Sequence, residues 1–582
     1  MAIPDAAAAA DPADVTIQDE STEQSDQQPL QLCTLPPEII TTIFEFLVPQ
    51  KPDLGETRPV SYEKLDEGEL WYDHTRSRRG LWSMCQVSRQ LSTIARPLLY
   101  RVVALLSEES MFLFFRTLTD QPHYGLWTRY LSVHLTLTRE TVIRETRRAV
   151  GRLLRTFRPA KTPAILLDPI RVALEIMEIS LPALSTYEGD FDDVPQVIVS
   201  FILMFLTRLD TLLLQVPVCD DHPEYEALFI KLAAAREHFQ QFGNTPEHAA
   251  LTPFQRIHTL LLQGDPELLA HFDTDDCSCE VPELYGAQPR RYHAMFAALP
   301  ALRTLEVSSD DGAWNSVLED EHNFLSGGTV DPYLRGLREI YLHDSVTCPI
   351  HLHQILRNAP DLETLYMTPR IDPRFEERNH HHHHHVPAEP DPMALDVALI
   401  NHAHNLRELD VAWYDCYGCY NLIGPEGRLA SLANNTKLEK LCVQLAVLFG
   451  ASPMTSAEGR GVAGPLPLAD LLPPNLVELT LEDWWWSSLD VYEAMRDWRR
   501  ADKLAYYRDN AEYRRRAVAM MSYFATGFRA RLGRLRKVLL LCKIPWAWEM
   551  AGSNGEVDAA FHFRDVKEVF REQGVEFSVE TV

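Results

Sequence analysis

The chain has 582 residues and a formal charge of −28, and it is long enough for several domains or one long repeat array. Its content of 46% hydrophobic and 24% charged residues is ordinary for a globular protein. The acidic balance argues against a nucleic-acid-binding protein and against electrostatic attachment to anionic lipid, because both need clustered Lys and Arg.

The chain opens on MAIPDAAAAADPADV, which carries acids and no basic segment, so a secretory signal is not expected. No apolar run approaches the ~20 residues that span a bilayer. The ten Cys residues are spread unevenly and do not form a disulfide framework, which favours a reducing compartment, the cytoplasm or the nucleus. Residues 1–31 have no Lys or Arg and almost nothing to bury, which predicts a disordered acidic tail.

Two helical patterns follow between residues 35 and 100. Pro36 and Pro37 stand where the first helix opens, a place where a missing N–H costs nothing. Apolar residues then recur at helical spacing, first at Ile39, Ile43, Phe46 and Leu47 and again at Val87, Leu91, Ile94 and Leu98. Ile40 and Phe44 widen the first apolar face beyond what a short surface helix needs. A module of this size buries too little surface by itself, so it needs the rest of the chain or a partner.

These stretches resemble an F-box, the three-helix module by which a substrate receptor docks on the Skp adaptor of a cullin-RING ubiquitin ligase. The matching residues are Leu35 to Ile40, Ile43, Phe46, Leu47, Val87 to Leu91 and Ala95 to Tyr100. The resemblance implies a helical module over residues 32–104 that contacts the adaptor through Leu35, Pro36, Ile39, Ile43, Val87 and Leu91. The family usually has a short turn between the two halves, whereas residues 48–80 are polar and contain Pro, which predicts an inserted loop. The alternative is a helical cap on the domain that follows.

A Leu-rich phrase recurs through the remaining residues, 105–582. It places apolar side chains at i, i+3, i+6 and i+8, and each copy ends in a period-2 pair typical of a short strand with one buried face. The copies end at Leu135, Leu214, Leu262, Val307, Leu342, Met367, Val411, Val443, Leu481 and Leu540. Helices are expected at 351–358, 395–403, 490–531 and 564–573, and a closing strand at 575–579.

This phrase resembles a leucine-rich repeat, in which strand and helix stack into a curved solenoid because one repeat cannot bury its own Leu residues. The resemblance implies an α/β fold, an irregular solenoid of short parallel strands plus helices. The copies lie from about 25 to nearly 80 residues apart, whereas regular repeats hold about 20–29. Long loop insertions are therefore expected, notably near residues 371–392 and 452–467. Ordinary helix-rich α/β packing is the alternative.

The chain contains no GxGxxG after a strand, no GxxxxGK[ST], no GxSxG and no HExxH, which predicts a protein without catalytic residues or cofactor. Two groups of metal-ligand residue types occur, the run His380 to His385 and the pairs Cys416/Cys419 and Cys277/Cys279. Their spacing does not match a zinc site, so a solvated His loop and free thiols are favoured and no metal is predicted. Two interpretations of Trp484, Trp485 and Trp486 are equally favoured, an anchor at a protein interface and packing in the core.

The residues between the buried positions of each strand face the concave side of a leucine-rich solenoid. In the middle repeats they mix Tyr with carboxylates, and the candidates for target binding are Glu306, Tyr341, His343, Tyr366 and Asp410. Tyr offers contact area with a polar tip, and the acids favour a basic target segment. The alternative is that these residues are only the solvated side of the strands. Leu213, Leu261 and Leu539 take the same place elsewhere, which predicts that insertions cover those repeats.

The resemblances together imply the substrate-recognition subunit of an SCF-type ubiquitin ligase. Its expected partners are a Skp-type adaptor, through it a cullin, and a target protein that the sequence does not name. A scaffold of leucine-rich repeats that does not assemble into a ligase is the first alternative, because the insert at 48–80 could crowd the docking face. An undetected hydrolase or metalloenzyme is the second.

Overall fold

The structure is a computed structural model that describes a defined part of the chain. The described residues are 35–48, 67–105, 108–133, 199, 202–203, 205–215, 254–263, 296, 299–308, 334–345, 347, 349–369, 394–411, 429–449, 468–483, 515, 517–542 and 563–581. They form two compact units, a helical unit over 35–48 and 68–99 and a sheet unit from Tyr100 onward. The predicted tail, the loops at 371–392 and 452–467, the His run, both Cys pairs and the three Trp residues lie outside the described residues.

The helical unit contains α1 (Pro37–Glu45), α2 (Glu67–Val87) and α3 (Arg89–Leu99). Pro36 and Pro37 open α1 as predicted, and the Pro36 carbonyl accepts the N–H groups of Ile39 and Ile40. Ser88 separates α2 from α3, and its Oγ accepts the N–H of Leu91 at 3.2 Å, which caps the start of α3. The core of this unit is formed by side chains from all three helices, namely Ile40, Phe44, Leu81, Leu91, Ala95 and Leu98.

Two expected boundaries in this region are wrong. Residues 67–80, assigned to the inserted loop 48–80, are helical and belong to α2. The Pro residues that indicated a loop stop at Pro59, and the segment from Glu67 has no helix-breaking Pro although it lacks an apolar stripe. The helical unit also ends at Leu99 and not at residue 104, because the chain then enters β1 (Val102–Leu105), the first strand of the sheet unit.

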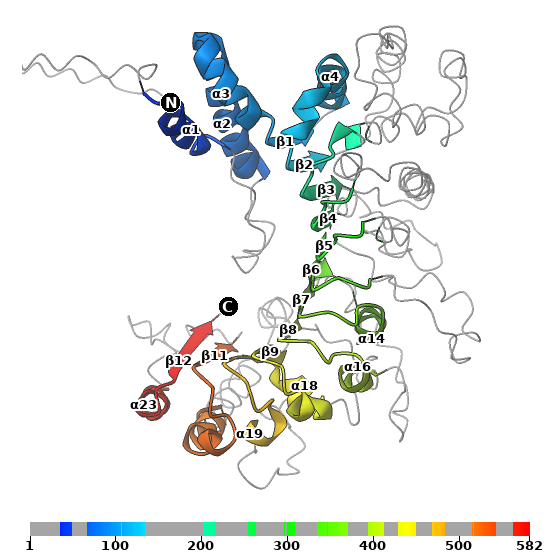
Figure 1. Cartoon of the computed structure of the whole chain (residues 1–582). Coiled ribbons are helices and arrows are strands. Elements are labelled where there is room, and N and C mark those ends of the chain that lie inside the picture. Colours follow the sequence, from blue (N-terminus) through cyan, green and yellow to red (C-terminus); the bar gives the residue numbers. More distant parts are fainter. Residues whose placement is uncertain are drawn as a thin grey trace, which may run out of the picture. The chain divides into compact units, whose positions relative to one another are not determined.

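The described residues of the sheet unit form an α/β fold around one sheet of twelve parallel strands, ordered from β1 to β12 as in the chain (Figure 1). After β1 come β2 (Tyr130–Val133), β3 (Thr211–Gln215), β4 (Thr259–Gln263), β5 (Thr304–Ser308), β6 (Glu339–Ser345), β7 (Thr364–Pro369), β8 (Glu408–Val411), β9 (Lys440–Gln444), β10 (Glu478–Asp483), β11 (Lys537–Cys542) and β12 (Glu576–Thr581). This open sheet is compatible with the predicted solenoid. All ten Leu-rich phrases and the closing segment contribute a strand, so the predicted α/β class with short parallel strands is confirmed.

One face of the sheet carries the Leu residues of the phrase. Leu305 and Val307 of β5 are 0% exposed and stand in register with Ile340 and Leu342 of β6. Helices pack on this apolar face, including α4 (Glu108–Asp120), α14 (Pro349–Asn358), α16 (Leu395–Asn401) and α23 (Arg564–Glu572). The expected helix at 490–531 is described from residue 515, and its Met520, Met521, Phe524 and Phe528 are buried in the same core.

The first repeat differs from the prediction in register. Leu131 and Val133 are its core residues, paired with Leu212 and Leu214, whereas the phrase had assigned Tyr130, Val133 and Leu135. Aromatic residues matched the apolar spacing of the phrase at positions two residues C-terminal to the true repeat. Thr128, which is fully buried, takes the place that Leu holds in later repeats.

The residue before each strand ties neighbouring repeats together through its carbonyl. The carbonyl of Arg303 accepts N–H groups from Arg338 at 2.8 Å and from Glu339 at 3.0 Å, and the same pattern runs along the sheet from Arg101 to Val477. Because each such residue is held by its neighbour, this strand-entry position has a fixed place in every repeat.

Candidate docking surfaces

The first candidate site is on the helical unit, where α1 is apolar on two sides. Ile40 and Phe44 point into the core and are 0% and 1% exposed. Ile39, Ile43 and Phe46 follow at i, i+4 and i+7 on another side, where they are 49%, 40% and 86% exposed. A surface helix needs one apolar side to pack against its own domain, and no described residue covers the second side of α1.

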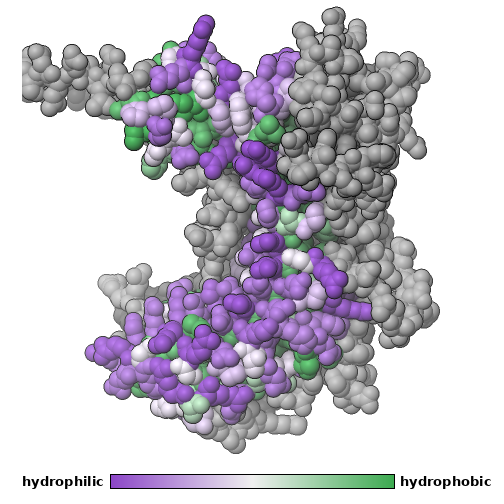
Figure 2. All heavy atoms as spheres, viewed as in Figure 1, coloured by the Kyte–Doolittle hydropathy of each residue, from purple (hydrophilic) through white to green (hydrophobic). Residues whose placement is uncertain are grey.

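Two residues of α2 in the same unit are also apolar and exposed. Trp82 is 57% exposed and Val87 is 65% exposed, whereas the neighbouring Leu81 is fully buried. Among the described residues, five of the eight large hydrophobic side chains that are exposed belong to this small unit. We define the apolar patch as Ile39, Ile43, Phe46, Trp82 and Val87. Figure 2 shows hydrophobic residues gathered over the helical unit, and such clusters mark interaction sites on soluble proteins.

The expected adaptor-binding residues divide between the patch and the interior. Ile39, Ile43 and Val87 are part of the patch, Pro36 is exposed beside it, and Leu35 is partly buried against the core. Leu91 lies inside the unit at 1% exposed, where it packs in the core that holds α3 against α1. Phe46 and Trp82 were not among the residues predicted to bind the adaptor. An apolar residue adjoining a buried one on a helix, as Trp82 adjoins Leu81, was the signal available.

The second candidate site lies on the face of the sheet opposite the Leu residues. Four predicted target-binding residues stand in one row across adjacent strands, Glu306 beside Tyr341, Tyr341 beside Tyr366 and Tyr366 beside Asp410. His343 lies two residues beyond Tyr341 on β6, so it is on the same face. We call these five residues the aromatic-acidic row.

Ring contacts hold the centre of the row. The Tyr341 and Tyr366 rings are 6.0 Å apart, and the His343 ring is 5.4 Å from that of Tyr366. His343 Nε2 lies 3.1 Å from Glu306 Oε1, although neither ring nitrogen of His343 makes an aligned hydrogen bond. Glu306 is only 9% exposed and His343 only 4%. Glu306 and His343, which were expected to contact a target, are therefore largely shielded from solvent. The accessible part of the row consists of Tyr341, Tyr366 and Asp410.

The row has a negative electrostatic environment. Burial, together with the nearby carboxylates of Glu339, Glu408 and Glu306, raises the pKa of the Tyr341 phenol to about 12. Tyr341 is thus a neutral hydroxyl at neutral pH, able to donate or accept a hydrogen bond. Glu408 is partly neutralised by Lys440, whose Nζ lies 2.8 Å from its Oε1 and whose pKa this hydrogen bond raises.

The chemistry of the row suits it to binding a cationic group. Two phenol rings beside carboxylates favour a cationic side chain, through charge and through the negative faces of the rings. Within the described residues, no three His, Cys, Asp or Glu side chains are placed to hold a metal ion. None of the described helices has the length and apolar character needed to cross a bilayer.

Comparison with known proteins returned no family assignment. No family model matches the chain, and no curated protein matches it significantly.

Proposed function

We propose that this chain is the substrate-binding subunit of an SCF-type ubiquitin ligase. In this proposal the helical unit docks on a Skp-type adaptor, and through it on a cullin, while the sheet unit captures a target protein. The observation that carries the proposal is the apolar patch, because α1 and its C-terminal cap present Ile39, Ile43 and Phe46 to solvent although α1 has already packed Ile40 and Phe44 inside. The F-box resemblance of residues 35–100 supplies the identity of the partner.

The patch has the size of an energetically useful contact. The exposed fractions of its five side chains amount to about three whole side chains, and burying them would contribute on the order of 6 kcal/mol before the cost of association. Aromatic anchors such as Phe46 and Trp82 are the residue types that dominate binding energy at protein interfaces. The patch is thus large enough to anchor a partner and small enough for the free chain to tolerate.

The function is positional and not enzymatic. Other subunits would carry out ubiquitin transfer, and this chain would hold the target so that one of its lysines has a high effective concentration near the activated ubiquitin. On the sheet, Tyr341, Tyr366 and Asp410 would receive a basic segment of the target, because the carboxylates around Tyr341 create a complementary potential. In such a complex the chain acts in the cytoplasm or the nucleus.

Co-purification with a recombinant Skp-type adaptor tests the proposal. The wild-type chain is expected to retain the adaptor in gel filtration, and the double substitution Ile39→Asp/Ile43→Asp is expected to abolish retention. Ile400→Asp is the matched control, because Ile400 is an exposed Ile of similar accessibility, 53%, on α16 of the sheet unit. Failure of the wild-type chain to bind any Skp-type adaptor would overturn the proposal and favour a repeat scaffold that does not enter a ligase.

A further inference from the structure

A cleft of about 540 Å³ lies at the edge of the sheet where the strands begin. Its walls come from the turns that lead into β5, β6, β7, β8 and β9, so five consecutive repeats contribute to it. Its charged lining residues are Arg303, Arg338, Arg407, Lys437, Asp361 and Glu363. We call it the basic cleft. It is separate from the aromatic-acidic row, which uses residues inside the strands.

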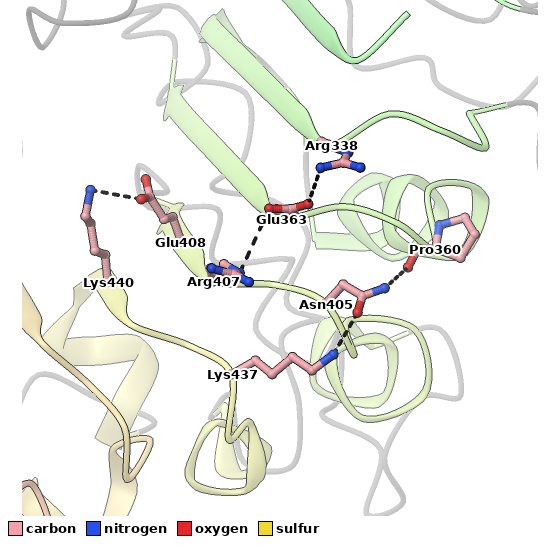
Figure 3. A network of polar contacts seen from close by, with 8 residues as sticks. All are labelled: Arg338, Pro360, Glu363, Asn405, Arg407, Glu408, Lys437 and Lys440. Carbon is pink, nitrogen blue, oxygen red and sulfur yellow. Dashed lines mark hydrogen bonds and ion pairs between the residues drawn. The ribbon is translucent and has the colours of Figure 1, made fainter. Parts of the chain in front are cut away.

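The charges of the basic cleft do not cancel. Four cationic side chains face two carboxylates, a local excess of two positive charges in a chain whose formal charge is −28. Glu363 is shared, with one oxygen 3.1 Å from Arg338 and the other 3.9 Å from Arg407 (Figure 3). One carboxylate therefore contacts two guanidinium groups, and each of these is more than half exposed.

The two remaining cations, Arg303 and Lys437, form no ion pair with a carboxylate of the described residues. Lys437 Nζ donates to Asn405 Oδ1 at 2.8 Å, and Asn405 in turn donates to the Pro360 carbonyl at 3.2 Å (Figure 3). This chain of contacts orients the Lys437 ammonium without neutralising it. Arg303 is exposed and forms no side-chain ion pair with another described residue.

The backbone holds these charges at regular intervals. Arg303, Arg338, Glu363 and Arg407 all occupy the strand-entry position, so the carbonyl ladder fixes each relative to the next. Neighbouring strands lie about 4.8 Å apart, which places Arg303 about 14 Å from Arg407. Four residues of an extended peptide cover about the same length, whereas a single inorganic anion covers much less.

A glycine keeps the middle of the cleft open. Gly336 stands two residues before the strand-entry position of β6, where the next three repeats have Asp361, Asn405 and Lys437. Its φ of +94° belongs to the left-handed region, in which a residue with a side chain is strained. The absence of a side chain at this point leaves the space between Arg303 and Glu363 accessible.

We propose that the basic cleft binds an acidic peptide segment of a partner protein, three or four residues long. The bound groups would be oxyanions, either Asp and Glu carboxylates or the phosphate of a modified side chain, received by Arg303, Arg338, Arg407 and Lys437. A nucleic acid carries the same kind of group, but a long polyanion is repelled by a chain of this net charge. This site goes beyond the proposed adaptor and target surfaces and depends on neither.

Fluorescence polarisation with the full-length chain tests this proposal. The probes are a labelled hexapeptide Gly-Glu-Ser-Glu-Glu-Gly, the same peptide with phosphoserine, its Gln-substituted neutral form, and a labelled ten-nucleotide single-stranded DNA, all at 50 mM salt. Both acidic peptides are expected to bind and the neutral peptide is not. A strong preference for the phosphorylated peptide would identify a modified side chain as the ligand, and equal affinities would identify carboxylates.

Three variants locate the binding. Arg303→Gln/Lys437→Gln is expected to weaken peptide binding at least tenfold, because each lost charge near an oxyanion changes affinity by about fivefold at low salt. Glu363→Gln removes the shared carboxylate and is expected to tighten binding by about fivefold. Arg536→Gln is the matched control, since Arg536 occupies the strand-entry position of β11 and does not line the cleft.

The opposite signs expected for the two cleft variants separate binding from a change in folding. Thermal unfolding and adaptor retention are measured on each variant and are expected to stay at wild-type values. Equal weakening by Arg303→Gln/Lys437→Gln and Arg536→Gln, or no effect of either, would overturn the assignment. So would tighter binding of the DNA than of the acidic peptides with the same dependence on Arg303 and Lys437.

Discussion

Phe44 of α1 and Phe46, the residue that caps the C-terminal end of this helix, provide the sharpest test of how the helical unit is built. They are two residues apart in the chain, yet Phe44 is 1% exposed and Phe46 is 86% exposed. Replacing Phe44 by Ala removes a core side chain that packs with Leu91 and Ala95, and such a change costs about 3–5 kcal/mol. Replacing Phe46 by Ala removes a side chain in water and is expected to change stability by less than about 0.5 kcal/mol.

Adaptor binding by the folded unit is expected to respond to the two substitutions in the opposite order, with the larger direct loss for Phe46→Ala. Complete burial of a Phe side chain contributes about 2 kcal/mol, so Phe46→Ala is expected to weaken adaptor binding by about thirtyfold while the unit stays folded. Phe44→Ala would reduce binding only by reducing the folded population of the unit.

Amide hydrogen exchange in α3 is the suitable assay for stability, because a chain of two units does not unfold in one step. Phe44→Ala is expected to accelerate exchange at least about a hundredfold, and Phe46→Ala is expected to leave it unchanged. If Phe46→Ala accelerated exchange as strongly as Phe44→Ala, Phe46 would be packed within the molecule, and the apolar patch could not be an unused face.

Three further predictions concern the sheet unit. The pKa of Tyr341, raised to about 12, means that the folded state holds the phenol proton more tightly than the unfolded state does. The resulting stabilisation is complete below pH 10 and is lost as the pH rises toward 12. Tyr341→Phe should lose this part of the pH dependence, measured as the difference in unfolding free energy from wild type. Gly336→Ala is expected to destabilise the sheet by about 1–2 kcal/mol in denaturant unfolding although the nearest atom to a new Cβ is 4.0 Å away, because the strain comes from φ; an unchanged midpoint would contradict this. A double-mutant cycle on Lys440→Met and Glu408→Gln should give a coupling below about 1 kcal/mol, since both side chains are largely solvated at 50% and 40% exposed; a larger value would require a shielded ion pair.

The strands of the sheet could be predicted because the Leu-rich phrase records a physical requirement. A side chain that points into the core must recur every second residue in a strand, and Leu305/Val307 and Ile340/Leu342 both follow this rule. The rule failed in the first repeat, where Trp127 and Tyr130 satisfied the spacing while Leu131 and Val133 formed the core. Aromatic residues suit either face of a sheet, so the pattern alone did not fix the register.

The candidate sites were predicted less completely. Alternation placed Tyr341 and Tyr366 on one face, but it could not show that Glu306 and His343 are shielded, because burial depends on neighbouring strands and ring contacts. The exposure of Phe46 likewise depends on which side of α1 meets α3. The basic cleft gave no local signal, since Arg303 and Lys437 are 134 residues apart and come together only through the order of the strands.

The agreement between strand order and chain order has a mechanical consequence. Each strand of the described sheet is bonded only to its neighbours in chain order, so no described strand has to insert between two strands that precede it in the chain. Tension applied between the two ends of the sheet unit would detach one strand after another, and the force–extension trace would show a series of separate unfolding steps. The number of residues between neighbouring strands would set the extension gained in each step, so the lengths of the connecting segments could be measured from the trace.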